Sequence, residues 1–125
     1  MEQNNAIYRE QSLLVQELAE KSDCVIVGRS ADYILRDKKP LRLFIYADME
    51  SRMERCRKRA PEQEHFTDKE LRRHIQDVDK RRSKYYQFFT GQTWGEKLNY
   101  DLCINSGKLG FEKTVELIES YINIK

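Results

Sequence analysis

Short runs of β-branched and aromatic residues, separated by longer stretches of helical periodicity, constrain the fold of this chain more than any other feature. The runs are CVIVG at 24–28, LRLFIY at 41–46 and YDLCIN at 100–105. Buried or half-buried strands have this length and composition. The stretches around them predict helices at about 6–21, 30–36, 49–59 and 68–89 and after Gly110. Strands separated by helices form βαβ units, so the sequence predicts an α/β fold with a parallel sheet.

Size, charge and cysteine content narrow the class of protein. A chain of 125 residues fits one domain. Its 23 Lys and Arg and 21 Asp and Glu leave a net charge of +2, which gives no overall field typical of a nucleic-acid-binding protein. The 3 cysteines, an odd number placed far apart, favour a reduced, cytoplasmic setting. No apolar stretch approaches the ~20 residues of a membrane span. We therefore expect neither a membrane nor nucleic acid as the partner.

A glycine and an arginine follow the first predicted strand. Gly28 ends the run CVIVG, Arg29 comes next, and a helix is predicted to begin at Ser30. Ligands of open α/β sheets bind at the carboxyl ends of the strands, where a guanidinium can clamp a phosphate and a glycine lets the backbone approach. The alternative is that Gly28 only turns the chain and that Arg29 is a solvated surface residue. The pair is a candidate phosphate site.

One arginine interrupts an apolar stripe of the predicted helix at 68–89. Arg82 occurs at helical spacing with the apolar residues of one face, namely Leu71, Ile75, Val78, Tyr85 and Phe89. Asp79 lies three residues before Arg82, so the two side chains are neighbours on the helix and can pair. An inward-facing ion pair costs desolvation and is more often kept for function than for stability. The alternative is a slightly rolled helix in which both groups reach water.

The remaining polar and aromatic residues predict neither a metal site nor a hydrolytic one. His65 and His74 are isolated from cysteines and from carboxylate pairs at ligand spacing. Residues 52–82 hold eleven Lys or Arg against seven Asp or Glu, a composition typical of a solvated helical face and also of segments that neutralise phosphates. The aromatic run KYYQFF at 84–89 and Trp94 favour core packing over a platform that stacks bases.

Four ordered blocks of sequence resemble the cytidylate-kinase-like family of P-loop kinases. They are CVIVGRSADYIL, LRLFIYA, DVDKRRSKYY and NYDLCINSGKLG, and together they span nearly the whole chain. The resemblance implies a three-layer, parallel-sheet P-loop kinase fold, truncated here to three strands with flanking helices. It also implies in-line transfer of the γ-phosphoryl group of ATP, with Mg²⁺, to a nucleoside monophosphate such as CMP.

The same resemblance assigns roles to residues on the acceptor side of the site. Gly28 and Arg29 match the Gly-Arg pair that contacts the monophosphate. Asp79 and Arg82 match the family's D-x-x-R, which holds the base and the phosphate of the acceptor. Cytidylate kinases have an aspartate where this chain has Ser30, so their preference for cytidine does not transfer to it.

The ATP side of the family's site is only partly represented in these 125 residues. The segment from about 55 to 71 matches the lid whose arginines close over the ATP phosphates, with the candidates Arg55, Arg57 and Arg59. The pattern G-x-x-x-x-G-K-[ST], which cradles phosphates and supplies a lysine and a Mg²⁺-bound hydroxyl, does not occur in the sequence. We therefore expect residues 1–125 to be a single partial kinase domain that binds neither ATP nor Mg²⁺ by itself and is inactive alone.

The resemblance also predicts a gap in the sheet. In the family, the strand that carries the phosphate loop lies between the strands that match 24–28 and 41–46. Either the strands at 24–28 and 41–46 pair directly, or an open slot leaves unpaired backbone groups, which invite a second copy of the chain or a complementing chain. A function of another class stays open: a non-catalytic scaffold that recognises a nucleotide through Arg29, Asp79 and Arg82, or binds RNA through its basic helices.

Overall fold

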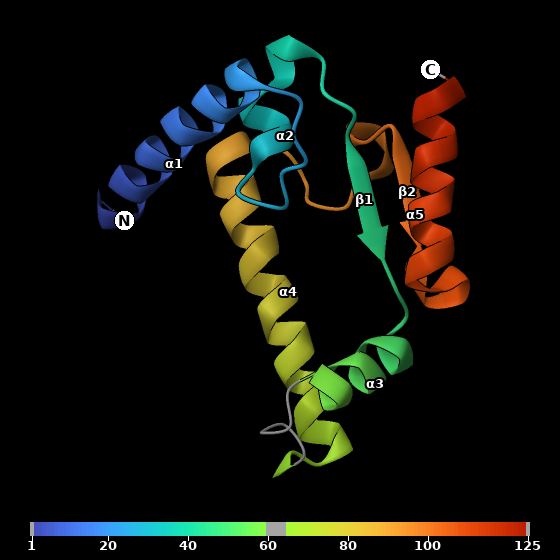
Figure 1. Cartoon of the computed structure of the whole chain (residues 1–125). Helices are drawn as coiled ribbons and strands as arrows, with labels where there is room; N and C mark the ends of the chain where they lie inside the picture. Colours follow the sequence, from blue (N-terminus) through green and yellow to red (C-terminus); the bar gives the residue numbers. More distant parts are fainter. Residues whose placement is uncertain (1, 60–64, 125) are drawn as a thin grey trace.

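The computed structural model describes residues 2–59 and 65–124. Along the chain its elements are α1 (Glu2–Lys21), α2 (Ala31–Ile34), the 3₁₀ turn η1 (Arg36–Lys38), β1 (Leu43–Tyr46), α3 (Met49–Arg59), α4 (Asp68–Thr90), the 3₁₀ turn η3 (Lys97–Asn99), β2 (Leu102–Asn105) and α5 (Ser106–Ile124). In Figure 1, α5 runs along one side of the strands, α4 stands on the other, and α3 lies near the carboxyl end of β1 and meets α4.

The sheet of the described chain consists of two parallel strands. β1 and β2 pair from Leu43 opposite Leu102 to Tyr46 opposite Asn105. Pairing continues just before the strands, where the Asp101 N–H donates to the carbonyl of Arg42 at 2.8 Å and the Arg42 N–H donates to the Asp101 carboxylate at 2.7 Å. Helices α3 and α4 connect β1 to β2, so the βαβ arrangement predicted from the sequence is present in this half of the chain.

The prediction of a third strand at 24–28 is wrong for the described chain. Residues 23–27 run as irregular chain outside the sheet, with Val25 and Val27 94% and 86% exposed. A β-branched run becomes a strand only where a neighbouring backbone pairs with it, and among the described residues β1 has a partner on one edge only. The structure is therefore a mixed helix and strand fold with a small parallel sheet, compatible with a truncated α/β fold.

The helices follow the predictions closely where their signals are local. α3 has the predicted bounds, and α4 extends one residue beyond them. α4 begins with a capping box, in which Thr67 Oγ1 accepts the Glu70 N–H at 3.1 Å and the Glu70 carboxylate accepts the Thr67 N–H at 3.0 Å. The predicted helix at 30–36 is shorter than expected, because only Ala31–Ile34 is α-helical and a 3₁₀ turn follows.

Two small apolar cores join the helices in pairs. Val15 of α1 packs with Ala31 and Leu35 in and beside α2. Met53 of α3 packs with Leu71 and Ile75 of α4. The aromatic run of α4 also serves packing, as predicted. The ring of Tyr8 in α1 stacks on that of Phe89 at 4.1 Å and lies 6.4 Å from that of Tyr85, and these contacts join α4 to α1.

Helix α5 leaves its predicted apolar face open to solvent. Phe111, Val115 and Ile122 are 49%, 53% and 54% exposed, although their spacing predicts one buried stripe. Within the described ranges, no helix is both long and apolar enough to cross a membrane.

Candidate functional site

The turn Gly28–Ser30 carries the first candidate residue. Its three residues all have positive φ, at 72° for Gly28, 59° for Arg29 and 55° for Ser30. The Ala31 N–H closes the turn by donating to the carbonyl of Gly28 at 3.1 Å. A left-handed backbone costs a residue with a Cβ of order 1–3 kcal/mol and is found most often at ligand sites. Arg29 is exposed at the tip of this strained turn.

Arg29 acts electrostatically on α4. Burial raises the pKa of the Tyr85 hydroxyl, the charge of Tyr8 adds to that rise, and the positive charge of Arg29 offsets part of it. Arg82 lies one turn of α4 before Tyr85. The charge of Arg29 therefore reaches Tyr85, one turn of α4 from Arg82.

The structure corrects the geometry predicted for Asp79 and Arg82. The Asp79 carboxylate forms its ion pair with Arg52 of α3, whose guanidinium reaches across from the neighbouring helix. Arg82 is exposed and has no ion pair within the described residues. The predicted inward-facing pair is wrong, because Arg52 takes the carboxylate and no described segment covers α4 at the level of Arg82. Asp79 and Arg82 are still on the same side of α4, three residues apart.

Arg52 is one of the available cations of the basic segment, with Arg55, Arg57, Lys58 and Arg59, and sequence reasoning missed only its pairing with Asp79. Its side chain and that of Asp79 are about equally exposed, at 29% and 27%. The two residues lie 27 positions apart in the chain, so no helical spacing relates them. The basic composition of 52–82 was the only signal, and it cannot single out one arginine.

The three lid candidates all have partners. Arg55 donates to the Ser106 hydroxyl at 3.1 Å and to the Ser106 carbonyl at 2.9 Å, and its guanidinium lies 4.2 Å from the centre of the Phe111 ring. Arg59 lies over the same ring at 4.9 Å. Arg57 donates to the Phe66 carbonyl at 3.0 Å and the Asp68 carboxylate at 2.8 Å. Of the predicted lid, residues 60–64 lie outside the described residues.

The carboxyl ends of the two strands meet in a tight contact. Asp48, two residues after β1, accepts the Ser51 N–H at 2.8 Å and the Ser51 hydroxyl at 3.0 Å. These bonds from Ser51 hold the pKa of Asp48 below its usual value, and the charge of Arg55 adds to the effect. A Cβ on Gly107, two residues after β2, would lie 3.0 Å from both the Asp48 carboxylate and the Ser51 hydroxyl. Only glycine fits there without displacing the Asp48 cap of α3.

The described carboxylates nearest the carboxyl ends of the strands already have partners. The carboxylates at this edge are engaged, Asp48 by Ser51 and Asp79 by Arg52. Across 2–59 and 65–124, no three histidine, cysteine or acidic residues gather as metal ligands.

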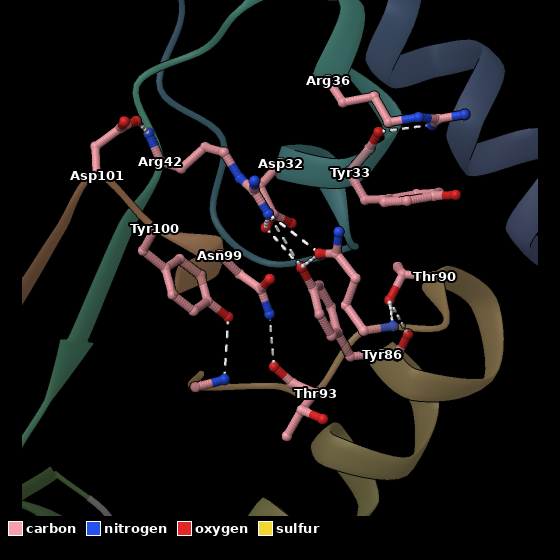
Figure 2. Close-up of polar contacts among 12 residues, drawn as sticks. Asp32, Tyr33, Arg36, Arg42, Tyr86, Thr90, Thr93, Asn99, Tyr100 and Asp101 are labelled. Carbon is pink, nitrogen blue, oxygen red and sulfur yellow. Dashed lines mark hydrogen bonds and ion pairs between the residues drawn. The ribbon is translucent and has the colours of Figure 1, made fainter. Parts of the chain in front are cut away.

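A second polar cluster lies at the opposite end of β1 (Figure 2). The Asp32 carboxylate accepts from Arg42 Nη2 at 2.9 Å and from the Tyr86 hydroxyl at 2.8 Å. Arg42 Nη2 also lies 3.3 Å from the Gln92 side-chain oxygen. Burial and the bond to Asp32 raise the pKa of Tyr86. These bonded pairs are 10 to 54 positions apart, which is why no sequence pattern predicted the cluster.

Comparison with known proteins places these features in a family. The chain belongs to the cytidylate kinase-like family, whose model matches residues 1–108. It is also similar to a solved structure, described as the crystal structure of an uncharacterized protein from Eubacterium ventriosum ATCC 27560, with a TM-score of 0.86 and 30% sequence identity. The match covers 95% of this chain and 66% of that one, so this chain spans about two thirds of the relative's length. No curated protein matches the sequence.

Proposed function

We propose that this chain binds the nucleoside monophosphate acceptor of an ATP-dependent phosphoryl transfer, with Arg29 as the phosphate contact. The observation that carries the proposal is the strained Gly28–Ser30 turn, which presents an exposed arginine whose charge reaches Tyr85, one turn of α4 from Arg82. Membership of the cytidylate kinase-like family supports a nucleotide as the ligand.

The charges suit a monophosphate. Its phosphate carries close to two negative charges at neutral pH, and Arg29 and Arg82 supply two exposed guanidiniums that can bind it through paired hydrogen bonds. Asp79 would hold a donor group of the base or sugar. Arg52 keeps the Asp79 carboxylate compensated while it is partly withdrawn from water.

The reaction of the intact family would move the γ-phosphoryl group of ATP to an oxygen of the monophosphate, leaving ADP and a nucleoside diphosphate. The described residues supply neither a phosphate loop nor a magnesium site. We therefore propose that the 125-residue chain binds the acceptor but does not catalyse transfer by itself. An ADP-coupled assay with CMP, UMP, AMP and GMP should show no turnover; sustained ADP release would contradict this part of the proposal.

The open edge of β1 supports a second part of the proposal, that a further strand completes the sheet. Val25 and Val27 are exposed beside the turn, and Ile45 and Tyr46 of β1 are 44% and 46% exposed. A strand between these segments would cover apolar side chains and pair the free backbone of β1. It would come from the remainder of a longer protein, from a complementing chain or from a second copy.

Titration calorimetry with CMP tests the binding proposal. Arg29→Ala and Arg82→Ala should each weaken binding by about 10- to 100-fold, the range for loss of a hydrogen bond to a charged group. Arg29→Lys should recover part of the loss, since it keeps the charge without the planar fork. Arg73→Ala, on the exposed opposite side of α4, is the matched control and should bind like the wild type.

Two outcomes would overturn the proposal. One is equal affinity of the wild type and Arg29→Ala for every monophosphate. The other is preference for RNA with an affinity that falls steeply between 50 and about 200 mM salt, which would favour the basic helices as a nucleic-acid surface.

A further inference from the structure

We propose that Asp32, Arg42 and Tyr86 are positioning residues that fix the Gly28–Ser30 turn relative to α4. The functional consequence, that they set where Arg29 stands, rests on the proposed function. The structural part does not, because it concerns only what holds the turn in place.

The turn needs an anchor, because its own backbone is strained. Arg29 and Ser30 both hold positive φ. Residues 23–27 before it lie outside the sheet, and the valines there are almost fully exposed. On the amino-terminal side Ile26 packs against the core of Val15, Ala31 and Leu35, which ties this side of the turn to α1 rather than to α4. A direct restraint toward α4 must therefore come from the residues that follow the turn.

Two anchors follow the turn, and they act in different directions. Ala31 and Leu35 pack against Val15, which ties α2 to α1. Asp32 instead reaches Arg42, just before β1, and Tyr86, near the end of α4. This second anchor relates the turn directly to α4, the helix that carries Asp79 and Arg82, whereas the first does so only through α1.

The second anchor is itself well fixed. Arg42 Nη2 and the Tyr86 hydroxyl converge on one oxygen of Asp32, as Figure 2 shows. At the end of α4, the Thr90 hydroxyl donates to the Tyr86 carbonyl at 2.6 Å and accepts the Gln92 N–H at 3.0 Å. The Gln92 side chain is thus held beside the same arginine. These converging charge-assisted bonds in a half-buried cluster restrain α2, the start of β1 and the end of α4 relative to one another.

The Asp32 cluster lies at the end of β1 that is far from the expected ligand, so its residues position the turn without contacting the ligand. Arg42 precedes β1, whereas Asp48 follows it at the edge where ligands of parallel sheets bind. Asp32 is already occupied by two donors and Arg42 by Asp32 and Gln92. These groups therefore act on Arg29 through α2 and do not themselves bind the phosphate.

Amide hydrogen exchange of the Ala31 N–H, which closes the turn, tests the inference directly. Tyr86→Phe removes one bond to Asp32 and leaves the ion pair with Arg42 intact. It should speed Ala31 exchange by about two- to tenfold, the effect of one lost hydrogen bond, while exchange in the middle of α4 stays unchanged. Arg42→Lys, which keeps the charge and loses the fork, should act in the same direction. Tyr33→Phe, on α2 itself, is the matched control and should leave Ala31 exchange as in the wild type.

Calorimetry with CMP on the same variants supplies the functional readout. Tyr86→Phe should weaken CMP binding by at most the factor by which it speeds Ala31 exchange, because affinity falls only with the fraction of chains in which the turn is closed, and Tyr33→Phe should not weaken it. Unchanged Ala31 exchange in both Tyr86→Phe and Arg42→Lys would overturn the inference, as would faster exchange spread evenly over the chain. If the wild type binds no CMP, the proposed function fails, and Ala31 exchange still decides whether the cluster fixes the turn.

Discussion

At the scale of single residues, Arg29 and Ser30 hold backbone conformations that side chains with a Cβ rarely adopt. Both have φ near 55–59°. Strain of this kind persists where the surroundings enforce it, and it clusters at binding sites. The strain at Arg29 can be measured separately from the charge, because glycine relieves it and alanine does not.

Arg29→Gly and Arg29→Ala should therefore differ in stability while both lose CMP affinity. We expect the glycine variant to be more stable than the alanine variant by about 1 kcal/mol, the cost of a left-handed residue less the extra unfolded-state entropy of glycine. Urea unfolding measures the difference. Equal stability of the two variants would show that the turn is not left-handed in solution.

Asp48 gives a pH dependence whose sign follows from its hydrogen bonds. The Ser51 bonds lower its pKa in the folded chain below the usual value of 3.8, so the charged form stabilises the fold. That stabilisation is present above the unfolded pKa and is lost as the pH falls through the folded pKa.

Asp48→Asn should therefore be less stable than the wild type at pH 7, and the difference should shrink as the pH falls below 3.8 and through the lower pKa of the folded chain, where the wild-type carboxylate becomes protonated. Thermal melts from pH 7 down to about 3 check this. A stability difference that stays constant over the whole range would contradict it.

At the scale of elements, the helices are governed by local signals. α4 begins at a capping box and is capped at its carboxyl end by Gly91, whose φ of 72° suits glycine.

The capping box predicts the effect of changing Thr67. Thr67→Ala should destabilise the chain by about 1 kcal/mol, since the Glu70 N–H loses its acceptor, and Thr67→Ser should retain most of the stability. Urea unfolding with both variants checks the cap; equal loss in the serine variant would indicate a packing role for the threonine methyl instead.

The same locality decides what the sequence could predict. The bounds of α3 and α4 follow from apolar periodicity and from residues at the helix ends. Each of these signals relates residues no more than about one helical turn apart. The strand at 24–28 failed because strand formation depends on a neighbouring backbone, which spacing along the chain does not reveal. The pairing of Asp79 failed for a similar reason: Arg82 was its neighbour in sequence, but Arg52 reaches it from another helix.

The candidate site divides in the same way. Gly28 and Arg29 could be identified from sequence because the glycine and the cation are adjacent. Arg52 and the Asp32 cluster could not, since their contacts join segments far apart in the chain. Residue type indicated a candidate phosphate site, whereas ion pairs between distant segments are visible only in the fold.

At the scale of the whole molecule, exposed apolar surface surrounds the open edge of the small sheet. Val25 and Val27 are 94% and 86% exposed, so they contribute little to the stability of the chain by itself. Replacing both with asparagine should change the free energy of unfolding by less than about 0.5 kcal/mol.

The same double variant should weaken association with any strand that completes the sheet. Sedimentation of the chain alone, and co-purification with the remainder of a longer relative, measure that association. Val25→Thr with Val27→Thr is the control, because threonine keeps the β-branched shape. Strong destabilisation of the asparagine variant as a monomer would show that the valines are buried in solution and that the edge is already covered.

The central claim, acceptor binding between the Gly28–Ser30 turn and α4, is tested most directly by mapping CMP onto the chain through backbone amide chemical shifts. The account predicts saturable shifts concentrated at 28–31 and 79–85 and abolished in Arg29→Ala, with the outer face of α4 around Arg73 unaffected. Shifts confined to the outer basic face of α4, or none at millimolar CMP, would contradict it.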